Sequence, residues 1–575
     1  MGRSRRHTPF VSFICAACAL CLSAASVGDL RGPQRRGSIA AAGPYHPPMN
    51  WRLLSRLLGS LALLVGASML LSLPWAFPWA GQVNATETDG IAGLAGSILL
   101  SLLIGGVLYW YGRGSSGPVL RKEALAVVGL GWMLAGFLGA MPYLLSGSLA
   151  ETDRAMTLAD CLFESVSGFS TTGASVLTEL EDPAYVPRCV MFWRSFTHWL
   201  GGMGIVVLFV ALLGSAGSGG KAIMRHEVPG PINSAARPRV KDTALLMWSI
   251  YVGLSGLLVV LYWFQGLSWY DALCHSFGTM ATGGFSTFND SMGHFGGPRA
   301  DFNVVEATTI AFMFLAGTNF TLFYLVVRQV QDRRTEPQAW LVPLLKDSEW
   351  RAYVGIVGGV AALLATAIWW QELYDLPTSI RHGLFMSLTI ITTTGYGTVD
   401  FLQWGEFAKG LLLAAMFIGG CAGSTGGGVK VIRVVLFFKI LWLQIEKAYR
   451  PSVVRPLRLG RQAVDEQVRT GVVLYLSLII GIFVVGWLAL ILIEPDATWR
   501  TVDFDYSSEK LLDSASAVIS CLNNIGPGLG LFGPKSNYAA FSEAGKLLLT
   551  SLMLLGRLEV YAVMVLLFPD FWRRG

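Results

Sequence analysis

The sequence predicts an all-α polytopic membrane protein in which two N-terminal transmembrane helices precede four repeats of helix, re-entrant loop and helix. Hydrophobic residues make up 53% of the 575 residues and charged residues only 14%, and the mean hydropathy is +0.53. A soluble globular protein rarely has this balance. Apolar runs of about 20 residues recur, and each is long enough to cross the bilayer as a helix. A short motif that returns at a fixed spacing indicates the repeats.

Ten apolar segments have the length and composition of transmembrane helices. They lie at 54–79, 92–112, 121–146, 188–213, 243–265, 304–328, 351–370, 407–440, 468–493 and 542–569. Arginine and lysine gather in every second connection, whereas the other connections are acidic. Because positively charged loops stay in the cytoplasm, we expect the basic connections and both chain ends to be cytoplasmic. The acidic connections then face outward, where they raise the local concentration of cations.

The first 48 residues do not fit this pattern. A basic start is followed by an apolar run from Phe10 to Ala25, which imitates a signal peptide, and then by a stretch rich in Gly, Pro and Arg. Translation from Met49 is the interpretation we favour, because Met49 leads directly into the first apolar segment. Residues 1–48 are therefore interpreted as a mis-assigned start or a disordered extension.

The sequence contains no pattern typical of catalysis or of a resident cofactor. The eight cysteines and seven histidines show no metal-ligand spacing and no disulfide framework. There is no nucleophile elbow, and no glycine-rich nucleotide fingerprint follows a strand. His198 and His275 are expected to be packing residues. We expect no enzymatic activity, no cofactor in this chain and no nucleic-acid partner; a membrane enzyme or a sensor on the same scaffold is the alternative from another class.

The internal repeat lies in the connections after the third, fifth, seventh and ninth spans. Each contains a short apolar segment followed by a strip rich in Gly, Thr and Ser. In three copies a Ser precedes the central glycine by eight residues, and the central glycines Gly173, Gly284 and Gly395 are 111 residues apart. The fourth copy, around Gly526, follows after 131 residues and lacks that Ser. Four repeats of helix, pore loop and helix use eight spans and leave the first two as an additional pair.

Four non-helical strips at similar depth predict a central pathway, because backbone inside a membrane is helical unless it is buried in protein or lines a watery cavity. Glycine lets a strip turn its carbonyl oxygens toward one axis, and a ring of carbonyls can replace the hydration shell of a monovalent cation. The short preceding helices point the negative ends of their dipoles at the cavity. The residues predicted to bind the ion are Thr171, Thr172, Gly173, Thr282, Gly283, Gly284, Thr393, Thr394, Gly395, Asn524, Ile525 and Gly526.

Only the third strip, from Thr393 to Gly397, approaches the TVGYG filter of potassium channels. Weaker selectivity than in such a channel is therefore expected. Close packing between membrane helices is the other reading of any single strip, because Gly and Thr also promote such packing. Four copies in register favour the ion pathway.

A glycine-rich run at 419–428 interrupts the eighth span. Each glycine costs about 1 kcal/mol relative to alanine in a helix, so a flexible loop below the strips is predicted, and it could act as a gate. A tightly packed helix is the alternative. Lys430 and Arg433 follow the run as either cytoplasmic anchors or parts of the gate. The predicted gate residues in the run are Gly423, Ser424, Thr425, Gly426, Gly427 and Gly428.

Arg557 lies near the middle of the last apolar segment. An arginine inside the membrane costs at least about 2.5 kcal/mol, so its side chain should face protein or water. Carbonyl oxygens of the broken eighth span are the predicted partners. Glu559 is two residues away and points elsewhere on a helix, so a local pair with Arg557 is not expected.

These motifs together resemble the TrkH-type subunit of the Trk/Ktr/HKT superfamily of potassium transporters, over residues 49–575. The segments that carry the resemblance are Trp199–Ile205, Ala316–Thr321, Gly420–Lys430, Asn523–Gly528 and Gly556–Glu559. The resemblance implies a pseudo-fourfold pore of four pore-loop repeats, potassium as the transported ion, and uptake across the inner membrane of a bacterium. It also implies a homodimer and a gate in the broken helix that Arg557 holds. A cytosolic TrkA-type regulatory subunit is the implied partner and would bind the regulatory nucleotide.

The predicted domain boundaries follow from the repeats. They are 1–48 for the extension, 49–115 for the N-terminal helix pair, 116–220, 240–335 and 348–462 for the first three pore repeats, and 463–575 for the fourth. Channel-like uptake and symport with protons or sodium both remain open. The alternative function is a sodium-coupled or weakly selective monovalent cation transporter.

Overall fold

The computed structural model describes residues 49–572 except 116, 118, 205–239, 297–303, 332–339, 453, 454, 461, 500–508 and 559. The described residues belong to one compact unit, Met49–Trp572. The extension predicted at 1–48 lies outside the described residues, and so do Glu559 and the last three residues.

Six helices in the described part of the chain are long and apolar enough to cross a membrane. They are α2 (Trp51–Met69), α3 (Thr88–Tyr111), α4 (Arg121–Leu145), α9 (Val240–Phe264), α14 (Ser348–Trp370) and α18 (Glu466–Ile493). They overlap six of the ten predicted spans. Counting each of two bent helix pairs as one span raises the number to eight.

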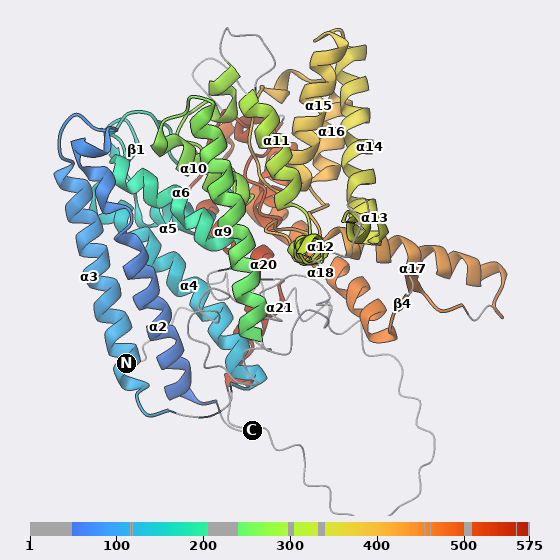
Figure 1. The fold of residues 1–575 in the computed structure, drawn as a ribbon, viewed down its shortest axis with the longest axis horizontal. Helices are drawn as coiled ribbons and strands as arrows, with labels where there is room; N and C mark the ends of the chain where they lie inside the picture. Colours follow the sequence, from blue (N-terminus) through green and yellow to red (C-terminus); the bar gives the residue numbers. More distant parts are fainter. Residues whose placement is uncertain are drawn as a thin grey trace, which may run out of the picture. The chain divides into compact units, whose positions relative to one another are not determined.

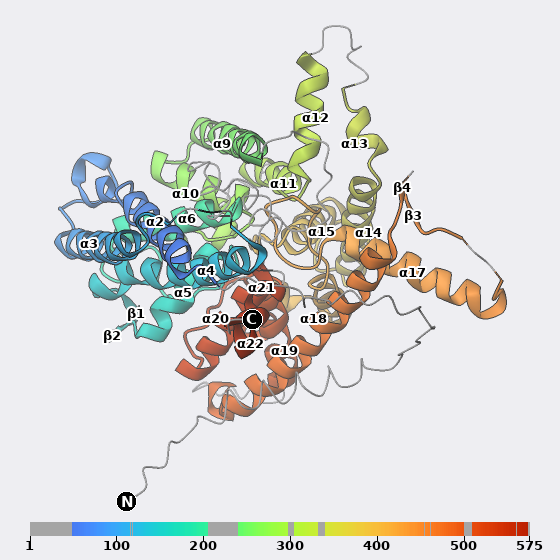
Figure 2. The same ribbon diagram turned by 90° about the horizontal axis from the view of Figure 1, so that it is seen from below.

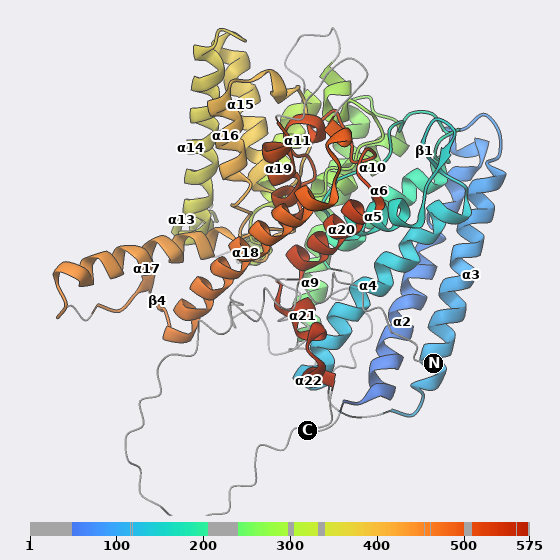
Figure 3. The same ribbon diagram turned by 180° about the vertical axis from the view of Figure 1, so that it is seen from behind.

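Helices α2, α3 and α4 lie side by side (Figures 1 and 3). Glycine allows the close approach of the first two, because a Cβ atom on Gly59 would lie 2.5 Å from the backbone nitrogen of Tyr109. Gly105 on α3 faces the same contact, and its added Cβ would lie 2.9 Å from Leu63. Small residues of this kind let membrane helices pack backbone to backbone.

The prediction of a continuous span at 304–328 is wrong. Helix α11 (Val304–Ala316) and helix α12 (Phe320–Gln331) meet at an angle of 96°. The carbonyl oxygen of Gly317, between them, accepts the backbone N–H of Cys421 at 2.9 Å. The backbone at this bend therefore bonds to another segment instead of continuing the helix, and an apolar run alone gives no sign of that.

Two further predicted spans are also interrupted, and for the segment 407–440 the structure confirms the interruption that the glycine-rich run predicts. The segment 407–440 divides into α16 (Glu406–Ala415) and α17 (Val431–Tyr449), and α17 runs away from the other helices in Figures 1 and 3. The segment 542–569 divides into α20 (Glu543–Arg557) and α21 (Tyr561–Met564), so Arg557 ends a helix and does not lie within one. Of the span predicted at 188–213, the structure describes α6 (Arg188–Gly202), and residues 205–213 lie outside the described residues.

Four short helices precede the four strips: α5 (Leu158–Phe169), α10 (Trp269–Met280), α15 (Leu376–Ile391) and α19 (Lys510–Leu522). Seen from below, they surround a common central region (Figure 2). Side chains fix where two of them begin, because Thr157 accepts the backbone N–H of Asp160 at 3.3 Å and Ser268 accepts that of Asp271 at 3.1 Å. These are N-cap bonds, which satisfy donors that the first helical turn leaves free.

The remaining elements are short. They are the helices α13 (Val342–Lys346) and α22 (Pro569–Trp572), and two antiparallel strand pairs, β1 (Leu149–Glu151) with β2 (Arg154–Ala155) and β3 (Arg458–Leu459) with β4 (Gln462–Ala463). The 3-10 helices are Leu73–Ala76, Pro78–Ala80, Ser291–Gly296, Phe401–Gln403, Asp496–Trp499, Gly530–Phe532 and Val565–Leu567. The five cysteines among the described residues are all buried and unpaired with one another.

Candidate functional site

Each of the four strips begins with the same backbone turn. The residue two positions before the central glycine has a positive φ in every strip, an uncommon conformation for a residue other than glycine. These residues are Thr171 (56°), Thr282 (53°), Thr393 (60°) and Asn524 (57°). The divergent fourth strip therefore has the backbone of the other three, although its sequence differs.

The hydrogen bonds of the turn repeat in the same way. In each strip the backbone N–H that precedes the central glycine bonds to a carbonyl in the last turn of the short helix, at 2.8 to 2.9 Å. The pairs are Thr172 with Ser167, Gly283 with Gly278, Thr394 with Thr389, and Ile525 with Ser520. The strips are thus continuations of helices α5, α10, α15 and α19, whose carboxyl ends all point to the strips.

The central glycines join the four strips into a closed ring. A Cβ atom added to any of them would strike the carbonyl oxygen of the next strip in chain order, and the fourth strip returns to the first. The distances from that Cβ to the carbonyl oxygen are 2.0 Å for Gly173 and Gly283, 2.0 Å for Gly284 and Thr394, 1.9 Å for Gly395 and Ile525, and 2.6 Å for Gly526 and Thr172. All four glycines also have a positive φ, between 77° and 106°. A larger residue is therefore excluded by its conformation and by lack of space.

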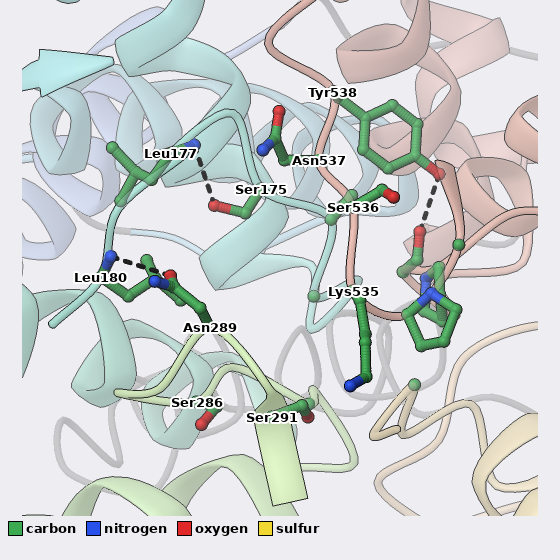
Figure 4. A pocket seen from close by; sticks show the side chains of 18 of the residues that line it. Ser175, Leu177, Leu180, Ser286, Asn289, Ser291, Lys535, Ser536, Asn537 and Tyr538 are labelled. Atoms are coloured by element: carbon green, nitrogen blue, oxygen red, sulfur yellow. Dashed lines mark hydrogen bonds between the residues drawn. The ribbon is translucent and has the colours of Figure 1, made fainter. Parts of the chain in front are cut away.

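A cavity of about 100 Å³ lies on one side of the ring (Figure 4). It is lined by the four central glycines and by the loops that follow the strips. The Tyr538 hydroxyl donates to the carbonyl oxygen of Gly526 at 2.8 Å, and the Lys535 ammonium lies 3.0 Å from the Asp290 carboxylate. Loops of the second and fourth repeats therefore meet at the mouth of this cavity.

The glycine-rich loop lies against the other side of the ring, where the residues with positive φ are found. The backbone N–H of Gly427 donates to the Thr393 hydroxyl at 2.8 Å, and a Cβ on Gly427 would lie 2.8 Å from the Cβ of Asn524. The hydroxyl of Thr282 lies 3.4 Å from that of Thr425. The predicted gate residues are thus brought together with the predicted ion-binding residues, on the side away from the cavity.

Arg557 connects the loop to the first strip. Its guanidinium donates to the carbonyl oxygen of Thr425 and to the hydroxyl of Thr171, both at 3.0 Å. It also donates to the carbonyl oxygens of Gly201 at 2.5 Å and Gly202 at 3.1 Å. The arginine therefore faces protein oxygens, among them a carbonyl of the broken eighth span.

Two buried residues hold the loop: Glu349, which was not predicted from the sequence, and Lys430, for which a cytoplasmic anchor and a part of the gate were both left open. One carboxylate oxygen of Glu349, on α14, accepts the backbone N–H of Ala422 at 2.7 Å and that of Ile432 at 3.2 Å. Lys430 is only 1% exposed, and its ammonium donates to the carbonyl oxygens of Gly426 and Gly427. Lys430 is therefore a bound part of the loop and not a surface anchor. Its place directly after the glycines was the available signal, whereas Glu349 lies far from the loop in sequence.

Among the residues that the structure describes, no group of three or more His, Cys, Asp or Glu could hold a metal ion. The oxygen atoms that lie against the central glycines are the backbone carbonyls of Thr172, Gly283, Thr394 and Ile525, which are uncharged. Uncharged oxygens of this kind suit a monovalent cation.

Apolar helices, bent helix pairs and four converging strips define a polytopic membrane protein of the transport class. A family model named TrkH and described as a cation transport protein matches residues 94–573. The chain belongs to this family.

Known relatives agree with that assignment. The chain is 34% identical over 529 residues to the Trk system potassium uptake protein TrkH of Salmonella typhimurium and to that of Escherichia coli, over 91% of this chain and 100% of each relative. It is 32% identical over 466 residues to the Trk system potassium uptake protein TrkG of Escherichia coli, over 81% of this chain and 88% of that protein. The crystal structure of the potassium transporter TrkH from Vibrio parahaemolyticus matches with a TM-score of 0.76 at 30% identity, over 91% of this chain and 100% of that chain.

Proposed function

We propose that this protein takes up potassium across the inner membrane of a bacterium, through a pore at the centre of the four strips. The observation that supports it best is the closed ring, in which a carbonyl oxygen of each strip lies against the central glycine of its neighbour. The relatives that are named potassium uptake proteins supply the identity of the ion.

The ring provides what a dehydrated K+ needs. Four uncharged carbonyls can replace hydration water, and the carboxyl ends of α5, α10, α15 and α19 add the negative ends of four helix dipoles. The carbonyls proposed to bind K+ belong to Thr171, Thr172, Gly173, Thr282, Gly283, Gly284, Thr393, Thr394, Gly395, Asn524, Ile525 and Gly526. The cavity, which lies on the side of the ring opposite the glycine-rich loop, is then the outer mouth, where ions collect before they enter the ring.

The glycine-rich loop is proposed to be the gate. It lies against the ring on the side opposite the cavity, so an ion that leaves the ring on this side meets it. Residues 423–428 include four glycines, which can change conformation at low cost. Arg557, Glu349 and Lys430 hold the loop in its present position through the bonds given above.

The setting of the protein in the cell is part of the same proposal. The basic connections support a topology with both chain ends in the cytoplasm. The relatives' names speak of a Trk system. A cytosolic TrkA-type subunit as the nucleotide-binding partner and a homodimer of this chain belong to the proposal because the resemblance to the TrkH-type subunits implies them. Uptake by symport is one form of the mechanism, and a pathway that K+ crosses passively is the other.

A sodium-coupled or weakly selective cation transporter is the second candidate. The residues before the central glycines favour it, because Thr172, Gly283, Thr394 and Ile525 are not alike. Unlike residues at one level of the ring make a less uniform ion site than four identical strips would.

Growth of a bacterium that lacks its own potassium uptake systems tests the proposal. The full chain, with a TrkA-type subunit supplied, should restore growth at low potassium, and the Gly395→Asp variant should not. Failure of a correctly inserted wild type to restore growth would contradict potassium uptake. The assay is then repeated with sodium in high excess. Growth equal to that without the added sodium supports a selective potassium pathway, whereas inhibition of growth by sodium supports the second candidate.

A further inference from the structure

A buried ion pair lies directly behind the first strip. The Arg194 Nε on α6 lies 2.6 Å from the Glu164 Oε1 on α5, and the two side chains are 2% and 0% exposed. Removing two charges from water is costly unless their remaining hydrogen-bonding groups are satisfied. Here Glu164 also accepts the hydroxyl of Ser175 at 3.0 Å and the backbone N–H of Val176 at 3.0 Å. The carboxylate thus binds the residues that follow the central glycine of strip one.

The same arginine also contacts the second strip. Its Nη1 donates to the carbonyl oxygen of Ser286 at 2.9 Å, and its guanidinium carbon lies 3.5 Å from the centre of the Phe285 ring. Both residues directly follow the central glycine Gly284. One guanidinium therefore links strip one, through Glu164, with strip two.

The second repeat contains an uncharged counterpart of the Glu164 contact. His275 and Glu164 each precede the central glycine by nine residues, and Ser286 and Ser175 each follow it by two. The Nδ1 of His275 lies 2.8 Å from the carbonyl oxygen of Asp271, which can only accept, so Nδ1 donates. In the neutral ring Nε2 then accepts, and it lies 3.0 Å from the Ser286 hydroxyl.

The third and fourth repeats cannot form this contact. They have Met386 and Ala517 where the first two have Glu164 and His275, and Gly397 and Gly528 where the first two have serine. This contact with a serine after the central glycine is therefore made only in strips one and two, and Arg194 joins the two.

From this geometry we propose that Arg194, Glu164 and His275 form a buried brace that fixes the spacing of strips one and two and thereby determines which cation the ring accepts. They are positioning residues, because none of them is a ring residue. The inference rests on the proposed function and names the part of the protein that sets its ion preference. A ring discriminates between K+ and Na+ by the number and placement of its carbonyls, so a change in spacing changes the preference.

Helix α5 also provides a matched control. Asp160 Oδ1 lies 2.6 Å from Lys546 Nζ, and these side chains are 0% and 2% exposed. The pair is thus as buried and as close as the proposed brace. Its other bonds run to Thr157 and Arg154, at the start of the helix and away from the strips.

The test compares E164Q with D160N in purified protein reconstituted into vesicles. The readouts are the ratio of K+ to Na+ uptake and the thermal midpoint. We expect E164Q to lower the ratio on the order of tenfold, the effect of losing one hydrogen bond to a charged group. D160N should lower the thermal midpoint and leave the ratio unchanged. A merely structural role of Glu164 would move the midpoint alone.

Two further variants cover a failure of E164Q to fold. S175A removes one bond to the carboxylate, and the E164Q/R194Q double variant removes both buried charges together. Both should lower the ratio. An unchanged ratio in the folded variants, or an equal loss in D160N, would overturn the proposal. Absence of K+ uptake by the wild type would instead refute the proposed function.

Discussion

The Arg557 contact gives the sharpest prediction about gating. Replacing Arg557 by Gln removes the charge-assisted bond to the carbonyl oxygen of Thr425, which is 3.0 Å long and reaches the proposed gate. A hydrogen bond to a charged group contributes about 1.5 to 3 kcal/mol. Losing it shifts the equilibrium of the loop toward the open form by roughly tenfold to hundredfold. Potassium flux should rise accordingly.

The flux is measured in vesicles that contain equal amounts of each variant, with the thermal midpoint as a check on folding. A second readout is the reactivity of Cys421 toward a thiol reagent, in protein whose other cysteines are replaced. This thiol in the loop is buried, so opening of the loop should raise its reactivity. Arg557→Lys is the matched control. It keeps a cation but not the planar fork that reaches several oxygens, so its effect should be intermediate. Unchanged flux and unchanged thiol reactivity in a folded Arg557→Gln variant would refute the reasoning.

Three other predictions follow from single sites. Gly284→Ala should abolish uptake, because the new Cβ would lie 2.0 Å from a carbonyl oxygen at a residue whose φ is +77°. Gly253→Ala, where no atom lies within 4 Å of the added Cβ, should retain uptake; potassium uptake at equal expression checks both. Glu349→Ala should destabilise the present position of the loop by about 1 to 3 kcal/mol and raise potassium flux. Glu349→Gln should have a smaller effect, because its side-chain carbonyl oxygen still accepts a backbone N–H; unchanged flux in both variants would argue against this contact as a restraint on the loop. Gly59→Ala should lower the thermal midpoint by separating α2 from α3, and Gly106→Ala, with open space around it, should not.

The strips were predictable because their chemistry depends on local sequence. A central glycine with positive φ is hard to replace, so Gly173, Gly284 and Gly395 mark the repeat. Two of the short helices that precede them also begin with an N-cap side chain. The fourth strip was found through Gly526 although its other residues diverge. Its shared backbone became evident only from the structure, because Asn524 has the same left-handed conformation as the threonines.

The parts that the sequence did not predict depend on contacts between distant segments. The bend after α11 follows from the bond between Gly317 and Cys421, and an apolar run reads as one span whether or not such a bond exists. Glu349 and Arg194 likewise bond to segments far away in the chain, and the sequence position of a single buried charge does not indicate which residue it bonds to. Closure of the ring is also a long-range property, since no spacing states which strip touches which.

The most direct test of the central claim is an experimental structure determined with a heavy K+ analogue such as Tl+, with and without excess K+. We predict anomalous density inside the ring, within bonding distance of the carbonyl oxygens of Thr172, Gly283, Thr394 and Ile525. Excess K+ should remove that density, and excess Na+ should not. An empty ring with the ion bound elsewhere in the protein, or density that Na+ displaces as well as K+ does, would contradict the claim.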